Sequence, residues 1–193
     1  KKPSIYLKAK NNIDSNKKIN FSSTEFIKDN NEFKPNLFYC KECKIIFSEF
    51  CDINFQNNYK DVNDVLYINQ IEFKKKYFKN LINKIAHHIK PSDSVLEIGS
   101  YYGAFGSEII KIVNKYQGIE LSSYASEYAK KKFNLKIFNG SIKNFFKINK
   151  EKFDIIFMFD VIEHLDDPNL ILKICSKKLN KNGRVIISTM NMD

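Results

Sequence analysis

The most constraining feature of this chain is a pair of segments about twenty residues apart. The first carries a glycine turn, and the second carries an acidic residue at the expected end of a strand. The first segment is Val95–Gly103 (VLEIGSYYG), and the second is Gly118–Ser122 (GIELS). They predict a buried strand, a turn that contains glycine, a helix, and a second strand that ends in an acidic residue. This is half of a nucleotide-binding α/β unit, in which the ligand lies across the carboxyl ends of the strands and the acidic residue holds the ribose hydroxyls.

The turn differs from the dinucleotide-binding fingerprint G-x-G-x-x-G, whose second glycine lets the backbone approach a pyrophosphate. Tyr101 occupies that position, and its phenol ring would obstruct a diphosphate. We therefore expect a ligand with an adenosine and no pyrophosphate. S-adenosylmethionine meets this description, because its sulfonium arm needs only a tight turn at Gly99 and room near Gly103.

Two later segments, Phe153–Pro168 (FDIIFMFDVIEHLDDP) and Leu179–Thr189 (LNKNGRVIIST), complete a recognisable series of motifs. Each motif alone has little specificity, whereas their order and spacing together are specific. On these residues, the stretch from Val95 to Asp193 resembles the N-terminal two-thirds of a class I S-adenosylmethionine-dependent methyltransferase of the small-molecule or sugar type. Both ends look cut, because the chain opens on lysine and closes just after a fifth predicted strand.

Strands and helices alternate along this stretch, which predicts an α/β fold with a Rossmann-like, doubly wound parallel sheet. The resemblance implies the strand order 3-2-1-4-5, with the last strands of the family missing. The expected strands are residues 95–98, 118–121, 136–138, 153–159 and 184–189, and the expected helices are residues 104–115, 123–133, a short one from 141, and 169–179.

The chain divides into three predicted regions: an N-terminal appendage (1–60), a linking helix (61–90) and the incomplete methyltransferase core (91–193). Residues 1–35 are polar and predicted to be irregular. The apolar patch that follows predicts two short strands joined by a turn at Lys41-Glu42. Apolar residues at helical spacing then predict the linking helix, which ends at Pro91.

Glu120 is the leading candidate for binding the cofactor. A carboxylate can accept two hydrogen bonds from a ribose diol, and such a contact is worth about 2–3 kcal/mol when it is shielded from water. In the resembled family, the acidic position of Glu97 supports the loop and the methionine end of the cofactor. The alternatives are an exposed glutamate at a strand end for Glu120, a loop-capping carboxylate for Glu97 and an ordinary turn glycine for Gly99.

The adenine ring needs an apolar slot and a polar atom at its amino edge. Family members often place an aspartate there, in a Gly-Asp pair after the third strand, and here Ser141 stands in its place. Leu121 and Ile142 would sandwich the ring, although both equally suit the core. The predicted cofactor-binding residues are Glu97, Gly99, Ser100, Tyr101, Gly103, Glu120, Leu121, Ser141, Ile142 and Asp160.

Asp160, Glu163 and His164 follow the fourth predicted strand and are the predicted catalytic residues. The segment resembles the glutamate-histidine loop of small-molecule methyltransferases, including the quinone O-methyltransferases. His164 is the natural base for a hydroxyl acceptor, since imidazole exchanges protons readily near neutral pH. Two alternatives stay open: the three side chains bind a divalent metal, or Glu163 and His164 brace the next helix.

Cys40 and Cys43 form one C-x-x-C knuckle, a possible zinc half-site. A structural zinc site needs four ligands, typically from two such knuckles. The resemblance implies an N-terminal zinc ribbon whose first knuckle would precede Lys1. The alternative is reduced thiols packed as small hydrophobic groups, which suits Cys51 and Cys175 better.

The formal net charge of +10 favours a nucleic-acid partner only weakly, because the lysine clusters fall in predicted helices and no aromatic residues interleave with them. No apolar window is long enough to cross a membrane, and we expect a cytoplasmic protein. The resemblance implies methyl transfer to a small molecule or sugar, most simply at a hydroxyl. The alternatives are a non-catalytic S-adenosylmethionine-binding partner domain and a basic RNA-associated methyltransferase-like protein, and the oligomeric state is left open.

Overall fold

The computed structural model describes residues 4–7, 37–39, 46–48 and 63–189. The chain divides into two compact units, Lys1–Asn58 and Tyr59–Asp193. The predicted division into appendage, linking helix and core stays a prediction. Cys40, Cys43 and Cys51 lie outside the described residues, and so does the turn at Lys41-Glu42.

The first unit contains three short antiparallel strands, β1 (Ser4–Leu7), β2 (Leu37–Tyr39) and β3 (Ile46–Ser48), in the order β1-β2-β3. β2 and β3 fall in the apolar patch that predicted two strands, and Phe38 pairs with Phe47. The prediction of irregular structure was wrong for Ser4–Leu7, because this segment pairs with β2. A strand this short carries too little apolar periodicity to be recognised alone.

The second unit contains a five-stranded parallel sheet in the order β6-β5-β4-β7-β8. This is the order 3-2-1-4-5 counted along the sheet's own strands, and it confirms the predicted doubly wound fold. The strands are β4 (Ser94–Ile98), β5 (Lys115–Glu120), β6 (Ile137–Asn139), β7 (Phe153–Phe159) and β8 (Leu179–Ser188).

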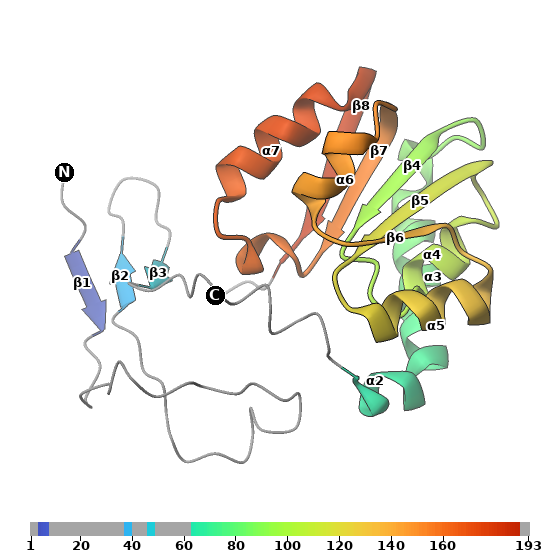
Figure 1. Cartoon of the computed structure of the whole chain (residues 1–193), viewed down its shortest axis with the longest axis horizontal. Helices are drawn as coiled ribbons and strands as arrows, with labels where there is room; N and C mark the ends of the chain where they lie inside the picture. Colours follow the sequence, from blue (N-terminus) through green and yellow to red (C-terminus); the bar gives the residue numbers. More distant parts are fainter. Residues whose placement is uncertain (1–3, 8–36, 40–45, 49–62, 190–193) are drawn as a thin grey trace. The chain divides into compact units, whose positions relative to one another are not determined.

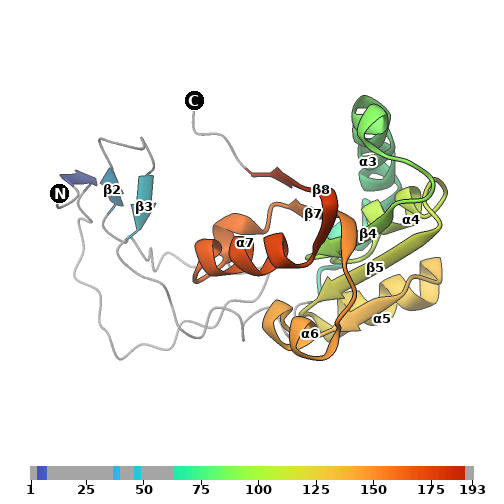
Figure 2. The same ribbon diagram turned by 90° about the horizontal axis from the view of Figure 1, so that it is seen from above.

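Helices cover both faces of this sheet, as Figures 1 and 2 show, with α3 and α4 on one side and α6 and α7 on the other. The central strands β4, β5 and β7 are buried on both faces because their side chains alternate between two apolar clusters. In β7, for example, Phe157 packs with the α3–α4 side and Met158 with the α6–α7 side. The helices are α2 (Val65–Asn69), α3 (Ile71–Ile85), α4 (Ala104–Ile109), α5 (Ser123–Phe133), α6 (Ile142–Ile148) and α7 (Pro168–Lys177), with the 3₁₀ helices η2 (Ala86–His88) and η3 (Ile162–His164).

Three predicted boundaries were wrong by several residues. The helix predicted over residues 104–115 ends at Ile109, and β5 begins at Lys115, because Tyr116 enters the core and its hydroxyl reaches Glu97. β8 begins at Leu179 and not at Arg184, and an irregularity in its pairing with β7 accommodates Asn182 at a φ of +66°. These changes come from pairing with distant strands, which local periodicity does not report.

The predicted linking helix is broken into α2, α3 and η2, with the first break at Gln70. α3 packs with its apolar side toward α4, so that Ile82 is buried and Phe78 lies against Phe105 and Phe159. Among the described residues, no helix has the length and apolar character needed to cross a membrane.

Candidate functional site

The turn between β4 and α4 lies at the carboxyl edge of the sheet, beside the place where the strand order reverses. The N–H groups of Gly99 and Ser100 both donate to the carbonyl oxygen of Ile119, at 2.9 and 3.0 Å. Gly99 has a φ of +76°, and a methyl group on it would collide with the Val161 side chain. The turn therefore requires glycine, and it touches the segment that follows β7.

Glu120 ends β5 directly beside this turn. Its Oε2 accepts a hydrogen bond from the Tyr101 N–H and its Oε1 one from the Ser122 N–H, both at 2.7 Å. The residue is only 7 % exposed, and burial raises the pKa of its carboxyl although the backbone hydrogen bonds oppose this. A carboxylate has about four acceptor positions, so some capacity remains beside the N–H groups of Tyr101, Ser122 and Leu121.

Glu97, in β4, and Ser100, in the turn, are both buried. Glu97 is 3 % exposed, and its Oε2 accepts a 2.5 Å hydrogen bond from the Tyr116 hydroxyl. Burial raises the pKa of the Glu97 carboxyl well above its usual range. The Ser100 hydroxyl is buried 3.5 Å from the Ile119 carbonyl oxygen. The Glu97 and Ser100 side chains therefore contact β5 inside the core, at Tyr116 and Ile119 respectively.

The two other predicted turn residues have different surroundings. Gly103, at a φ of +79°, begins α4, and a side chain on it would press against Ala129 and Leu135 at 2.8 Å. Its small size therefore serves the packing of α4 on α5. Tyr101 has a φ of +45°, and its hydroxyl donates to Asp64 Oδ2 at 2.9 Å.

Sequence reasoning missed Asp64 and Tyr67, which the start of α2 brings to the site. The Tyr67 ring lies edge-on to Tyr101 at 4.7 Å and stacks on Tyr102 at 5.6 Å. The pKa of the Tyr67 phenol is raised by burial and by the charges of surrounding carboxylates, which include Glu97 and Glu120. The sequence signal that could have drawn attention to Asp64 is a local one: it is the N-cap residue of α2, and its side chain accepts the Tyr67 N–H.

The predicted adenine-binding residues lie at the ends of β5 and β6. Ser141 caps α6, with its hydroxyl accepting the Asn144 N–H at 3.2 Å. Leu121 and Ile142 are half-buried, and Ile142 packs against the α6–α7 cluster. Asn139, which sequence reasoning missed, donates through Nδ2 to the carbonyl oxygens of Glu120 and Leu121, each at 3.0 Å.

The predicted catalytic residues follow β7 and are exposed. Asp160 has a φ of +52°, and its N–H donates to the Ser188 carbonyl oxygen at 3.0 Å. Glu163 and His164 lie in η3. Within residues 63–189 no three His, Cys, Asp or Glu side chains are grouped so that they could hold a metal ion, so the geometry does not favour the divalent-metal alternative for Asp160, Glu163 and His164.

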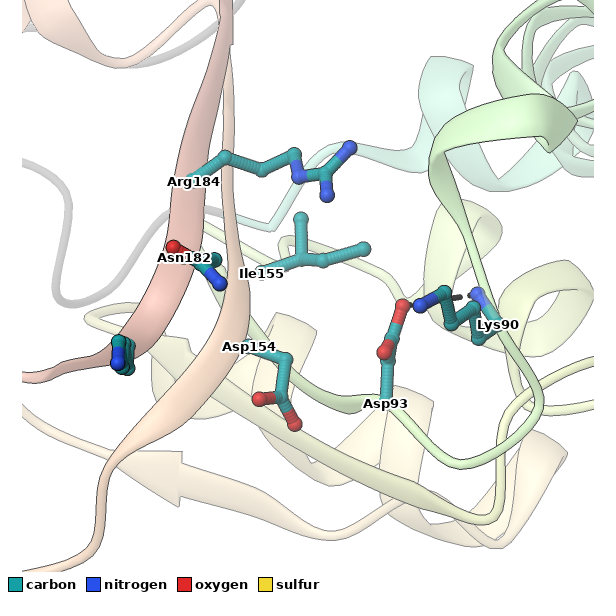
Figure 3. Close-up of a pocket in the computed structure, with 7 residues that line it drawn as sticks. Lys90, Asp93, Asp154, Ile155, Asn182 and Arg184 are labelled. Carbon is teal, nitrogen blue, oxygen red and sulfur yellow. Dashed lines mark hydrogen bonds between the residues drawn. The ribbon is translucent and has the colours of Figure 1, made fainter.

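A polar hollow of about 180 Å³ lies at the opposite edge of the sheet, where β4 and β7 begin (Figure 3). Arg184 and Asn182 line it from β8, and Lys90 and Asp93 line it from the segment before β4. Asp93 Oδ2 accepts the Lys90 N–H at 2.8 Å. None of the predicted site residues lines this hollow.

Comparisons with known proteins agree with this geometry. Residues 70–193 match the family model described as a methyltransferase domain. The chain is 33% identical over 124 residues to the ubiquinone biosynthesis O-methyltransferase of Pelagibacter ubique. The matched region covers 60% of this chain and 52% of that protein. The chain is also 33% identical over 114 residues to the mitochondrial ubiquinone biosynthesis O-methyltransferase of Saccharomyces cerevisiae, covering 54% of this chain and 36% of that protein. The chain thus spans about half or less of the length of these curated relatives.

Solved structures show the same fold. CalS10, an amino pentose methyltransferase from Micromonospora echinaspora solved with S-adenosylmethionine bound, aligns with a TM-score of 0.56 at 14% identity, covering 68% of this chain and 58% of that chain. An S-adenosylmethionine-dependent methyltransferase from Archaeoglobus fulgidus aligns with a TM-score of 0.56 at 19% identity, covering 67% and 60% of the two chains. Since the family model spans well over half of the sequence, the chain belongs to the methyltransferase domain family.

Proposed function

We propose that this protein transfers a methyl group from S-adenosylmethionine to a hydroxyl of a small-molecule or sugar acceptor. Membership of the methyltransferase domain family supports the reaction class. The relatives at 33% identity are named as O-methyltransferases of ubiquinone biosynthesis, which favours a hydroxyl on a small molecule. The Gly99 turn and Glu120 supply the site in which the cofactor would lie.

The observation that carries this proposal is the Glu120 carboxylate. Backbone N–H groups hold both of its oxygens in place, two of them at 2.7 Å, and they leave acceptor capacity for further donors. A ribose 2′,3′-diol offers two such donors. A buried carboxylate gains most from charge-assisted hydrogen bonds of this kind, so the residues present fit an adenosyl group.

The charges of the site also suit this cofactor. The chain carries a formal net charge of +10, yet Asp64, Glu97, Glu120 and Asp160 all act on Tyr67 at this edge of the sheet. When bound, S-adenosylmethionine supplies an electrophilic methyl group on a positively charged sulfonium. The carboxylates of Glu120 and Asp160 would attract that charge, so this edge complements the cofactor although the net charge of the chain is positive.

His164 is proposed as the base that accepts the proton of the acceptor hydroxyl, and Glu163 and Asp160 are the other proposed catalytic residues. Its exposure in η3 leaves it accessible to an acceptor molecule. Alignment of the acceptor oxygen with the methyl group supplies the larger part of the acceleration in such a displacement. Ser141, Leu121 and Ile142 are proposed to contact the adenine ring, at the end of the sheet where Glu120 would hold the ribose.

Calorimetric titration with S-adenosylhomocysteine tests the site directly. Glu120→Gln keeps the shape of the side chain but removes its charge and replaces one acceptor oxygen by an NH₂ group. We expect this variant to bind about 30- to 100-fold more weakly, as the loss of a shielded, charge-assisted contact of about 2–3 kcal/mol implies. Glu127→Gln on the exposed face of α5 is the matched control and should bind like the unmodified protein. Equal affinities for the two variants would contradict the assignment.

A further inference from the structure

Two segments at the amino edge of the sheet carry exposed isoleucines among lysines. This edge, where the strands begin, is opposite the candidate cofactor site. Residues 110–115 join α4 to β5 and read IKIVNK, and residues 147–152 close α6, lead to β7 and read KINKEK. Ile148 is 70 % exposed, and Ile110 and Ile112 are exposed as well. Each segment therefore presents aliphatic side chains to its surroundings.

Contacts with each other and with the core hold these two segments in place. Lys115 Nζ lies 3.5 Å from Glu151 Oε1, which joins one segment to the other. The carbonyl oxygen of Asn149 accepts a 2.5 Å hydrogen bond from Lys178 Nζ. Val113 is buried in the core beside the exposed isoleucines of its segment. The two segments therefore lie side by side at the amino edge and are anchored there.

The lysines of segment 147–152 carry positive charge that no acidic side chain neutralises. Lys147, Lys150 and Lys152 are exposed, and within residues 63–189 none of them forms an ion pair. The acidic side chains near the two segments, Glu108 and Glu151, each pair with another lysine. An uncompensated positive charge therefore surrounds the isoleucines.

Positive charge continues along the rest of the amino edge. Lys90, Lys181 and Arg184 line the polar hollow there and outnumber its two acidic residues, Asp93 and Asp154. α3, α5, α6 and α7 each have lysine in the last turn, and each precedes a strand that begins at this edge. The helix dipole favours lysine in a last turn, but it explains neither the lysines beyond the helices nor the exposed isoleucines.

The carboxyl edge of the sheet has the opposite character. Asp64, Glu120, Asp160 and Glu163 gather there, around the candidate cofactor site. A negatively charged surface would therefore attract the amino edge more strongly than the carboxyl edge.

We propose that the amino edge docks this protein on an anionic lipid membrane. The side chains of Ile110, Ile112 and Ile148 enter the headgroup region, and the lysines around them bind lipid phosphates. A membrane suits this surface because it offers negative charge and hydrocarbon together. The cofactor edge then faces the aqueous phase. This inference goes beyond the proposed function and does not depend on it.

A nucleic acid is the less suitable anionic partner for this edge. Surfaces that bind nucleic acids use arginine forks and stacked aromatic rings, whereas the chain contains a single arginine, Arg184. The exposed large aromatic residues of the described part, Phe73, Tyr77 and Tyr124, belong to α3 and α5. The isoleucines of the amino edge have no use in such a complex.

Co-sedimentation of the full chain with lipid vesicles tests the docking. We expect binding to vesicles of phosphatidylcholine that contain one third phosphatidylglycerol, and we expect salt to weaken it because counter-ions screen exposed charges. Vesicles of phosphatidylcholine alone should bind far more weakly. Equal binding to both kinds of vesicle, or no binding to the mixed vesicles at low salt, would overturn the proposal.

Two variants separate the apolar from the basic contribution. Ile148→Ser should weaken binding to the mixed vesicles about fivefold, since it removes one aliphatic side chain from the headgroup region. Lys147→Gln, Lys150→Gln and Lys152→Gln combined should weaken it about a hundredfold, as the loss of three lysines near an anionic surface implies. Both variants should give the circular dichroism spectrum of the unmodified protein, because all four side chains are exposed. Undiminished vesicle binding by either folded variant would contradict the docking.

Phe73→Ser on α3 is the matched control, since Phe73 is also 70 % exposed and is followed by lysines. It should bind the mixed vesicles like the unmodified protein. A loss in Phe73→Ser without a loss in Ile148→Ser would move the docking surface to α3 and overturn the assignment to the amino edge. Tight binding of a duplex RNA together with indifference to the mixed vesicles would make a nucleic acid the partner instead.

Titration with S-adenosylhomocysteine distinguishes the docking from the proposed function. Its affinity should be the same with and without mixed vesicles, because the two edges of the sheet are opposite. An affinity that falls when vesicles are added would place the lipid at the cofactor edge and overturn the proposed orientation. Vesicle binding by a protein that does not bind S-adenosylhomocysteine would contradict the proposed function and support the docking.

Discussion

Two segments meet at the carboxyl edge of the sheet, and they are held in very different ways. In the turn after β4, the backbone of Gly99 and Ser100 is bonded to β5, and both oxygens of the nearby Glu120 are engaged by N–H groups. In the segment after β7, Asp160 and His164 are exposed. Hydrogen bonds within the chain therefore fix the proposed cofactor half of the site, whereas the side chains of the proposed reaction half are exposed.

The two halves nevertheless depend on each other through one contact. A side chain at Gly99 would strike Val161, which follows Asp160 and precedes η3. The position of the segment after β7 is therefore set partly by the absence of a side chain in the turn after β4. Substitutions on either side of this contact test whether the two halves of the site are coupled.

Gly99→Ala should have the largest effect. The backbone at this position would keep a φ near +76°, which residues with a side chain disfavour, and the new methyl group would collide with Val161. Backbone strain and overpacking together should lower the free energy of unfolding by about 2–5 kcal/mol. Chemical denaturation measures this loss, and binding of S-adenosylhomocysteine should fall with it.

The double variant Gly99→Ala with Val161→Ala separates the two causes. Removing the Val161 side chain relieves the collision and leaves the backbone strain. The double variant should therefore lose less stability than the sum of the two single variants, which a double-mutant cycle measures. Strict additivity would mean that the two halves are not coupled through this contact.

His164→Ala should come next, and it should affect only the proposed reaction half. We expect turnover of a hydroxyl acceptor to fall about a hundredfold, as for loss of a general base. Affinity for S-adenosylhomocysteine and the free energy of unfolding should stay unchanged, because the side chain is exposed. His87→Ala, on a histidine of η2, is the control. Unchanged turnover in His164→Ala would exclude the role of base.

Glu97→Gln should have the smallest effect, and that effect should depend on pH. The folded pKa of Glu97 is raised by burial, so the folded protein retains a proton that the unfolded chain loses above about pH 4.3. Stability of the unmodified protein should fall as pH rises through this window, by up to about 1.4 kcal/mol per pH unit for this group. Gln cannot ionise and still offers the Tyr116 hydroxyl an acceptor.

The measurement for Glu97→Gln is the difference in free energy of unfolding between the variant and the unmodified protein. This difference should shift in favour of the variant as pH rises from 4 and should level off above the folded pKa. A difference that is independent of pH between 4 and 8 would show that the Glu97 carboxyl is not perturbed by its burial.

The sequence could predict the elements whose bounds depend on local patterns of apolar and capping residues. β7 was predicted with its observed bounds, because a run that is apolar on both faces suits only a central strand. α5 was predicted equally well, since Ser122 caps it and Asn134 ends it in a left-handed conformation. The placement of Glu120 at the end of β5 followed from the same patterns.

The rest depended on contacts between distant residues. The early end of α4 and the start of β5 reflect the hydrogen bond between Tyr116 and Glu97, 19 residues apart. Asp64 reaches the site through residues 37 and 38 positions away. No periodicity or spacing in the sequence encodes such a contact. The cap that Asp64 provides for α2 is a local signal for a helix start, but it does not reveal that Asp64 contacts the turn after β4.

The carbonyl oxygen of Glu120 accepts two hydrogen bonds from the end of β6, one from the Asn139 amide and one from the Gly140 N–H at 2.8 Å. The tips of two neighbouring strands are thereby locked to a single peptide group. A displacement at the end of one strand is transmitted to the other, so the ends of β5 and β6 respond to a bound ligand as one rigid unit.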